Sequence, residues 1–523
     1  MAAVPPGVSW VARHLSTLCG ATASAAALVA VLVATRDQPM MSPDSVTYLA
    51  AAEHIRSLDG IRDLTGLPLT VFPPVYPFLL APGGASLGWA RVIGALSLAT
   101  AAWFLFVLVR RRGGTPPALV AALALGLSPG LIRVASTVWS ETPYLAISAA
   151  TLAVLCVPSV TRRAAIVGGL LASAGFLTRY AGAGLVATAA VVVILATWSR
   201  ADRWVVRGAF VAAVAVPVLA WVVRNTMLTG QPLGPRFEGG SRDSLSVLVR
   251  RPVVAIGELL GGRGTGRDAR STIGWIVVWL TVAAVVALGA VLARRLLARR
   301  PPDTALVTDV AVAGFALTGV VLPVLARMAT SNDIEYRVMS PMVLPVVYAA
   351  VVTTWRLGTR LGQRRGVWAF AAVAVVGGGP WVLRGLRDAG DFPGGVTASL
   401  NNRSQFSIPL YDAVERLPPS ATVMTNNPHR VWWFNRREPT YFGFTRPRPG
   451  NSVYPRSPAD TVALACRPDA YLAWFIRPGD PPSDPFTMRP DLAALVHLQL
   501  VQQMSNGMLY RMAVDRDRCP AQR

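Results

Sequence analysis

Two acidic residues of this sequence stand where a carboxylate could take part in chemistry. Asp44 lies just after the first long apolar segment, and Glu141 lies at the start of a later one. Glu141 is the sole acidic residue between Asp63 and Asp202. A carboxylate at the edge of an apolar region is costly to desolvate, so one placed there is a candidate for function. Asp44 and Glu141 are therefore the first candidates for a site.

Each carboxylate also has a simpler structural explanation. The residues after Asp44 recur at helical spacing and predict an amphipathic helix along a membrane surface, at Tyr48, Ala51, Ala52 and Ile55. Asp44 would then cap that helix by accepting backbone N–H groups. Glu141 would compensate the dipole at the N-terminus of its own helix. The sequence leaves both interpretations open.

The composition indicates where these helices lie. Hydrophobic residues make up 53% of the 523 residues, charged residues make up 15%, and the mean hydropathy is +0.45. Soluble proteins carry about 25% charged residues. The chain is therefore predicted to be an α-helical polytopic membrane protein, and neither a soluble enzyme with a membrane tail nor a disordered chain fits.

Basic residues supply the net charge of +23, and all of them are arginine. The arginines cluster at the ends of apolar segments, and no nucleic-acid-binding motif is visible. We therefore interpret the charge as membrane topology and expect no nucleic-acid partner.

About eleven apolar segments are long enough to be candidate membrane helices. They lie near 16–34, 86–109, 117–133, 141–158, 164–178, 181–198, 204–223, 272–293, 305–326, 337–355 and 367–383. The boundary at Arg179 and Tyr180 is the weakest. Arginine-rich loops fall on every second connection, which predicts a cytoplasmic N-terminus and an extracytoplasmic C-terminus. Cleavage of residues 1–34 as a signal peptide is an alternative that leaves the other loops on the same sides.

The predicted organisation is a transmembrane domain over 1–383 and an extracytoplasmic domain over 384–523. The first has two long outer loops, 35–85 and 224–271, and the glycine-rich residues 261–266 follow no strand and are expected to be flexible loop. The second is predicted to be a small α/β domain, with strands at 421–425, 470–475 and 508–514 and helices at 408–417 and 459–466. Cys466 and Cys519 both lie in it, either as a disulfide or as two free thiols.

Other chemistries have weak support. His14, His54, His429 and His497 share no metal-ligand spacing, and the sequence holds neither a C-x-x-C motif nor a Walker A motif. The aromatic and basic run at 431–437 could grip an acceptor glycan, although a core strand or helix is the more ordinary interpretation.

Taken in order, these features resemble the GT-C superfamily of integral-membrane glycosyltransferases. The closer resemblance is to the branch with the protein O-mannosyltransferases and the lipid A aminoarabinose transferases. It is carried by Asp44 with the following Tyr-x-x-x-Ala helix (Tyr48 to Ala52), by Pro-Pro-x-Tyr ending at Tyr76, and by Glu141 in the next outer loop. It covers roughly residues 15–240, and no motif in the tail matches.

The resemblance implies a donor sugar on a polyprenyl phosphate in the outer leaflet. An acceptor hydroxyl would attack the anomeric carbon, with Asp44 as the general base and polyprenyl phosphate as the leaving group. Glu141 would orient the acceptor or Asp44, or hold a divalent metal ion; family members carry Asp at this second position. No other cofactor is implied.

The leaving phosphate needs positive charge, which arginine supplies with paired N–H donors. Arg337 and Arg179 are the first candidates, followed by Arg224 and then Arg236, and each has the alternative of reaching to lipid head groups. Substrate-cavity residues would be Tyr48, Tyr76 and Tyr180.

The expected function is therefore transfer of a sugar, with arabinose and mannose as candidates, to a cell-envelope glycan, lipid or protein. The expected location is the plasma (inner) membrane. One alternative is a lipid or solute transporter, which would carry polar residues in the middle of its helices. The other is a non-catalytic scaffold, in which Asp44 and Glu141 would face away from each other.

Overall fold

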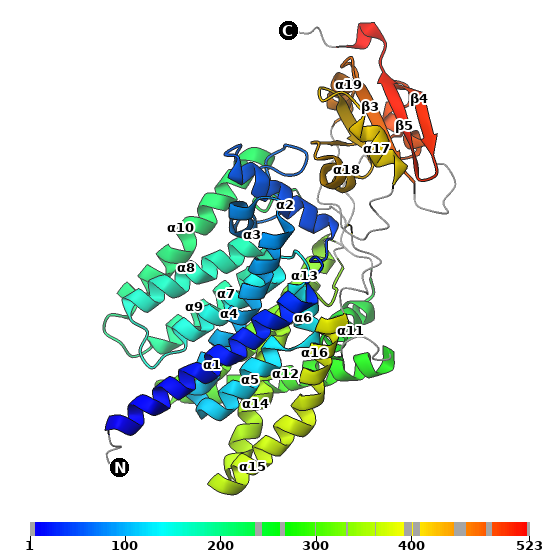
Figure 1. Cartoon of the computed structure of the whole chain (residues 1–523). Helices are drawn as coiled ribbons and strands as arrows, with labels where there is room; N and C mark the ends of the chain where they lie inside the picture. Colours follow the sequence, from blue (N-terminus) through cyan, green and yellow to red (C-terminus); the bar gives the residue numbers. More distant parts are fainter. Residues whose placement is uncertain are drawn as a thin grey trace.

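The computed structural model describes residues 6–235, 243–261, 267–298, 300–330, 333–360, 362–391, 400, 408–443, 457–476 and 484–519. A long helical bundle carries a small sheet domain at one end (Figure 1). That end also holds two short helices of the first outer loop, α2 (Pro43–Arg56) and α3 (Val75–Leu80). The N-terminus lies at the opposite end of the bundle.

The bundle is built from helices that are apolar along most of their length. They are α1 (Pro6–Ala34), α4 (Leu87–Gly113), α5 (Thr115–Gly126), α6 (Pro129–Ala135), α7 (Glu141–Leu155), α8 (Arg162–Thr178), α9 (Ala183–Ala196), α10 (Arg203–Thr229), α11 (Leu245–Gly261), α12 (Arg267–Leu297), α13 (Thr304–Thr330), α14 (Val343–Arg360), α15 (Gln363–Val373) and α16 (Gly379–Asp391). The main core joins α1, α4, α5, α7, α9, α13 and α14 through small and branched apolar side chains.

Seven helices within the described ranges are long and apolar enough to cross a membrane, and the bent pair α5–α6 would make eight. Helices α7 and α9 are apolar but shorter. The chain is thus a multi-pass membrane protein. Each predicted apolar segment contains a helix, but the count of eleven spans is not confirmed.

The segment predicted as one span over 117–133 is bent. Helix α5 ends at Gly126, α6 begins at Pro129, and their axes differ by 54°. Proline has no N–H to donate and disfavours helical backbone at the residue before it, so the helix breaks there.

The weakest predicted boundary, at Arg179, is a tight turn. Helix α8 ends at Thr178, Arg179 is extended, and a short 3₁₀ turn over Tyr180–Gly182 leads into α9. A Cβ at Gly182 would lie 2.5 Å from the backbone of Gly175, so only glycine permits this close return.

The prediction that 224–271 is a loop was wrong. Helix α10 continues to Thr229, and a further helix, α11, occupies Leu245–Gly261. Arg250, Arg251 and Pro252 interrupt the apolar pattern of α11, which hides it from a hydropathy search. The glycine-rich stretch predicted as flexible loop lies, from residue 262 to 266, outside the described residues.

Arginines from separate loops meet at the end of the bundle near the start of α1. Arg110 donates to Ser16 Oγ at 3.2 Å, and Arg112 and Arg356 both bind Asp309, at 2.8 and 3.1 Å. The arginine-rich ends of α4 and α14 therefore lie close together, through their shared partner Asp309.

The C-terminal domain is a five-stranded sheet with helices α17 (Pro409–Glu415), α18 (Pro428–Asn435) and α19 (Pro458–Ala465). The strands are β1 (Thr422–Thr425), β2 (Thr440–Tyr441), β3 (Ala470–Phe475), β4 (His497–Met504) and β5 (Gly507–Ala513), in the order β2-β1-β3-β5-β4. The pairs β2–β1 and β1–β3 are parallel, and β3–β5 and β5–β4 are antiparallel. The α/β character and all three predicted strands are confirmed, and β2 and β4 are additional.

The sheet domain has its own apolar core and a disulfide between Cys466 and Cys519, so the alternative of two free thiols does not hold.

Helix α16 ends at Asp391, beyond the domain boundary expected at 383. The aromatic run at 431–437 lies largely on α18, where Trp432 and Trp433 pack into one cluster with Tyr48 and Leu49 of α2. The domain is thus joined to the bundle through α2.

Candidate active site

Asp44 occupies the first turn of α2 without capping it. The N-cap is Ser42, whose hydroxyl accepts from Ser45 N while the Ser45 hydroxyl accepts from Ser42 N. This reciprocal capping leaves the Asp44 carboxylate for other partners. The eight residues from Ser45 to Ala52 are all buried, so α2 is an enclosed helix and the predicted surface amphipathic helix was wrong.

The partner of Asp44 is Arg337, in the turn before α14. Arg337 Nη1 donates to Asp44 Oδ2 at 2.7 Å, and Arg337 Nε lies 3.0 Å from Glu335 Oε2. The guanidinium lies over the Trp139 ring, 5.0 Å from its centre. Burial alone would lower the pKa of Arg337, but the charges of Asp44, Glu141 and Glu335 raise it. Arg337 therefore stays a cation.

A short backbone bridge brings the starts of α2 and α7 together. Met40 N donates to Ser136 O at 2.8 Å, and Val138 N donates to Met40 O at 3.0 Å. Trp139 Nε1 then donates to Ser42 Oγ at 2.8 Å. These bonds hold the two predicted acidic positions at one place in the fold.

Glu141 is almost fully buried, with 2% of its surface exposed, and its partner is Arg179. Arg179 Nη1 lies 2.5 Å from Glu141 Oε1. The same guanidinium donates to Ser140 Oγ at 3.3 Å, and the Ser140 hydroxyl lies 3.2 Å from Tyr48 Oη. Arg179, in the turn between α8 and α9, therefore neutralises the charge of Glu141.

Two of the predicted cavity tyrosines pack beside this charged group. Tyr48 and Tyr76 meet edge to face, with ring centres 4.9 Å apart, and Phe72 packs on Tyr48 at 4.8 Å. Burial raises the pKa of both tyrosines, and the charges of Asp44 and Glu141 raise the pKa of Tyr48 further. Both hydroxyls therefore stay protonated and can donate hydrogen bonds.

The two acidic residues belong to one electrostatic group. The charges of Asp44 and Glu141 both act on Tyr48 and on Arg337. This arrangement differs from the one that the scaffold alternative requires, in which the two carboxylates face away from each other. We call Asp44, Glu141, Arg179, Arg337 and Tyr48 the acid–arginine cluster.

The other predicted residues lie in a separate group that supports the first outer loop. Arg224 Nη1 donates to Leu69 O at 2.9 Å and Nη2 donates to Ile61 O at 3.3 Å. Tyr180 Oη donates to Thr70 O at 3.2 Å and accepts from Trp221 Nε1 at 3.0 Å. Arg236 lies outside the described residues.

Several residues of the site were not expected from the sequence. Ser140, Trp139 and Glu335 contact members of the cluster, and their neighbours in sequence gave only weak signals. His429 on α18 is buried, which lowers its pKa to about 4, and the Asp44 charge opposes this effect. Since the two lie 385 positions apart by their numbers, no local pattern could have paired His429 with Asp44.

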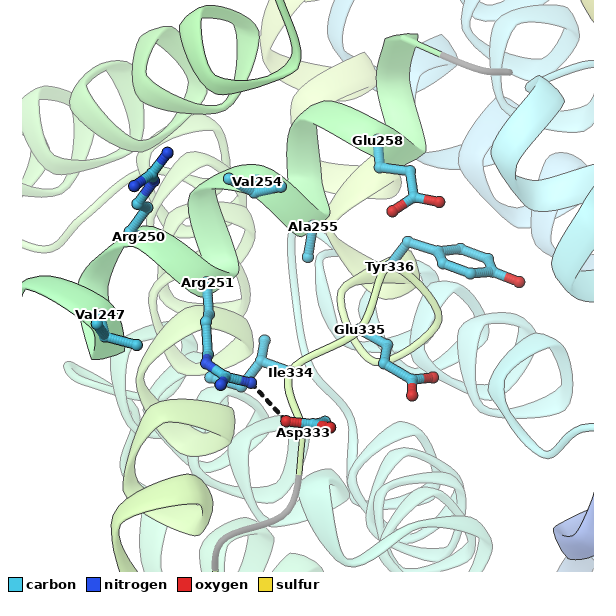
Figure 2. A pocket seen from close by; sticks show the side chains of 10 residues that line it. All are labelled: Val247, Arg250, Arg251, Val254, Ala255, Glu258, Asp333, Ile334, Glu335 and Tyr336. Atoms are coloured by element: carbon cyan, nitrogen blue, oxygen red, sulfur yellow. Dashed lines mark hydrogen bonds and ion pairs between the residues drawn. The ribbon is translucent and has the colours of Figure 1, made fainter. Parts of the chain in front are cut away.

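A cavity of about 590 Å³ opens beside Arg337. Helix α11 forms one side and residues 333–336 form the other, and the Arg251–Asp333 ion pair joins them (Figure 2). Glu335 both lines this cavity and approaches Arg337. The acid–arginine cluster therefore has an open space next to it.

The divalent metal expected at Glu141 stays a prediction. Within the described ranges, no group of three His, Cys, Asp or Glu side chains is arranged to hold a metal ion. Asp44 and Glu141 instead each face an arginine.

Comparisons with known proteins show a family match over part of the chain and a fold that solved structures share. Residues 73–221 match the family described as dolichyl-phosphate-mannose-protein mannosyltransferase. That stretch includes Tyr76, Glu141 and Arg179 but not Asp44 or Arg337. No curated protein sequence matches the chain.

Solved structures resemble the chain over nearly its whole length. ArnT from Cupriavidus metallidurans bound to undecaprenyl phosphate is 14% identical, with 96% of this chain and 99% of that chain covered and a TM-score of 0.57. The apo state of the same protein gives a TM-score of 0.59 at 14% identity, with 99% and 100% covered. The oligosaccharyltransferase AglB from Archaeoglobus fulgidus, in complex with an inhibitory peptide and a dolichol-phosphate, is 12% identical, with 98% and 76% covered and a TM-score of 0.53.

At these identities the likeness is one of fold, and the match to the family adds a sequence pattern over 73–221. The chain therefore shares its fold with ArnT and AglB, and its residues 73–221 match the dolichyl-phosphate-mannose-protein mannosyltransferase family.

Proposed function

We propose that this protein transfers a sugar from a polyprenyl phosphate to a cell-envelope acceptor at the outer face of the plasma membrane. The observation that carries the proposal is the Asp44–Arg337 ion pair at 2.7 Å beside the buried Glu141–Arg179 pair. A candidate base and two candidate phosphate-binding cations then occupy one place. ArnT was solved with undecaprenyl phosphate, and AglB with a dolichol-phosphate, which supports a donor of this class.

In the proposed reaction the acceptor oxygen forms a bond to the anomeric carbon of the donor sugar. The acceptor proton passes to the Asp44 carboxylate, and the bond between the anomeric carbon and the phosphate oxygen breaks. The electron pair stays on the departing polyprenyl phosphate. Arg337 and Arg179 stabilise that growing negative charge, because guanidinium groups offer paired N–H donors to phosphate.

The Asp44–Arg337 pair links binding of the donor phosphate to the availability of Asp44 as the base. A donor phosphate competes with Asp44 for the N–H groups of Arg337, and so draws the cation away from the base. The Asp44 carboxylate then loses its ion-pair partner, and its oxygens are open to the acceptor hydroxyl. The base is thereby activated when a donor is bound.

The proposed orientation places the N-terminus in the cytoplasm and the sheet domain outside. Arg110 contacts Ser16 near the start of α1, and α1 starts at the end of the bundle away from the sheet domain (Figure 1). Cytoplasmic ends of membrane proteins carry an excess of arginine. The Cys466–Cys519 disulfide supports an oxidising compartment for the sheet domain.

Release of polyprenyl phosphate by purified protein tests the proposal. The native chain is incubated with a panel of polyprenyl-phosphate pentoses and hexoses and a crude envelope acceptor, and Asp44→Asn is compared with Asp59→Asn. Asp59 has an exposed carboxylate in the same outer loop and serves as the matched control. We expect a loss of about 10²- to 10⁴-fold for Asp44→Asn alone, at unchanged thermal stability. Equal release by Asp44→Asn and native protein would remove Asp44 as the base, and no release from any donor would count against the transferase.

A further inference from the structure

We propose that the cavity between α11 and residues 333–336 is the acceptor subsite, and that it takes a neutral, hydroxyl-rich acceptor such as an oligosaccharide. This inference rests on the proposed function and names the substrate class of the same site. It selects the glycan from the three acceptor classes (glycan, lipid and protein) that the sequence leaves open.

The cavity reaches the acid–arginine cluster through one residue. Glu335 lines the cavity and lies 3.0 Å from Arg337 Nε, and Arg337 donates to Asp44. A ligand that contacts Glu335 is therefore separated from the proposed base by a single arginine side chain. The acceptor hydroxyl has to approach Asp44 from nearby, and the cavity is an open space beside the arginine that binds Asp44.

The cavity is lined by both aliphatic and polar side chains, which suits a sugar ring. Val247, Val254, Ala255 and Ile334 supply an aliphatic surface, and the charged and polar groups come from Arg250, Arg251, Glu258, Asp333, Glu335 and Tyr336. A sugar ring has an apolar C–H face and a rim of hydroxyl groups. The volume of about 590 Å³ also falls in the range of roughly 300–1,000 Å³ typical of small-ligand sites.

The charges of the lining favour a neutral ligand. Asp333 is paired with Arg251 at 2.5 Å, Glu258 with Arg133 at 3.3 Å, and Glu335 with Arg337 at 3.0 Å. Each carboxylate is thus already compensated by an arginine, so the three ion pairs add no net charge that would select a charged acceptor. A carboxylate has about four lone-pair positions, so paired acids still accept hydrogen bonds from hydroxyl groups.

The walls are also held in place before a ligand arrives. Arg251 and Arg327 bridge Asp243 and Asp333, which ties α11 and the end of α13 to the 333–336 segment. Tyr336 is packed under the Arg133 guanidinium, 4.1 Å from the ring centre. A preformed site loses less entropy on binding than a mobile one.

The test uses two valines of α11 with the same exposure. Val247 lines the cavity and is 36% exposed, and Val249 does not line it and is 37% exposed. Val247→Trp narrows the cavity, and Val249→Trp is the matched control. Binding of neutral methyl disaccharides (arabinosyl, mannosyl, galactosyl and glucosyl), of a uronic-acid disaccharide and of a serine-rich peptide is measured by saturation-transfer NMR without donor.

We expect native protein, Val249→Trp and Asp44→Asn to bind a neutral disaccharide, and Val247→Trp to bind it at least about tenfold more weakly. In the transfer assay, Val247→Trp should raise the acceptor KM by a similar factor and leave the donor KM unchanged. Since binding is measured without donor, disaccharide binding without transfer would support the cavity and count against the proposed function.

Three results would contradict the proposal that this cavity binds the acceptor, without contradicting the proposed transferase function. One is transfer in which Val247→Trp and Val249→Trp show the same acceptor KM. Another is preferential binding of the uronic-acid disaccharide or of the peptide. The third is no binding of any neutral disaccharide. A half-buried position in the same wall, Val254→Phe, repeats the test if Val247→Trp is poorly folded.

Discussion

The guanidinium of Arg337 donates a 2.7 Å hydrogen bond to the carboxylate of Asp44, although the two residues are 293 positions apart in the chain. Asp44 lies on α2 in the first outer loop and Arg337 lies in the turn before α14, so the pair links that loop to a late part of the bundle. The proposed base, Asp44, is thus bound to Arg337, the cation that is proposed to stabilise the leaving phosphate.

Substitution of Arg337 tests this dual role. We expect Arg337→Gln to lower kcat by about 10²- to 10³-fold, because the developing phosphate charge loses a preorganised donor. Arg337→Lys should retain part of the activity, since lysine keeps the charge but not the paired N–H groups. Steady-state kinetics with varied donor concentration measures both. Full activity in Arg337→Gln would contradict the role in phosphate stabilisation.

Substitutions at Glu141 and at Arg179 are expected to have strongly non-additive effects on stability. Removing one partner of a buried ion pair leaves a charge uncompensated and costs about 3–5 kcal/mol. Glu141→Gln and Arg179→Gln should therefore each lower the unfolding temperature, and the double variant should recover part of the loss. The exposed pair of Arg200 and Asp202 is the control, and little coupling is expected there because solvent screens the two charges. Additive effects at Glu141 and Arg179 would show that the two do not act as a pair.

Acid should destabilise the sheet domain through His429. Burial lowers the pKa of His429 from 6.5 to about 4, so the unfolded chain binds more protons than the folded chain between these values. Stability is therefore complete above pH 6.5 and falls as the pH drops towards 4, by about 3 kcal/mol. Thermal unfolding of native protein and of His429→Gln over this range measures the effect. An equal pH slope in both proteins would contradict it.

The disulfide should contribute substantially to the stability of the sheet domain. Cys466 and Cys519 are 53 positions apart, and closing a loop of this length is worth about 4 kcal/mol through the entropy of the unfolded chain. Cys466→Ser should unfold the domain at a lower temperature, and reductant should have the same effect on native protein. Cys156→Ser, a change within the bundle, should leave the reductant sensitivity intact. An unchanged unfolding temperature after verified reduction would refute the expectation.

The sequence was informative wherever the cause of structure is local. Apolar runs located the bundle helices other than α11, and short runs rich in β-forming residues located β1, β3 and β5. Asp44 and Glu141 could be chosen because isolated acids at the ends of apolar segments are costly unless they have partners. Arg179 and Arg337 were predicted on other grounds, as ligands of the donor phosphate, and in the structure they are the ion-pair partners of the two acids.

Long-range relationships could not be predicted in the same way. Which arginine meets which acid depends on how the helices pack, and His429 joins the site from a separate domain. Helix α11 was missed because its charged residues face a cavity that exists only in the folded chain. The capping role went to Ser42 instead of Asp44, because a serine pair three residues apart satisfies the backbone by itself.

The packing of α18 on α2 has a consequence for biosynthesis. Trp432 and Trp433 cover part of the helix that carries Asp44, yet they are translated more than 370 residues after α2 ends at Arg56. At a translation rate of about 5–20 residues per second, Trp432 and Trp433 are synthesised roughly 20–75 s after α2. During this interval the nascent chain can insert its helices, but the face of α2 that packs against Trp432 and Trp433 has no cover from α18 until that helix has been translated.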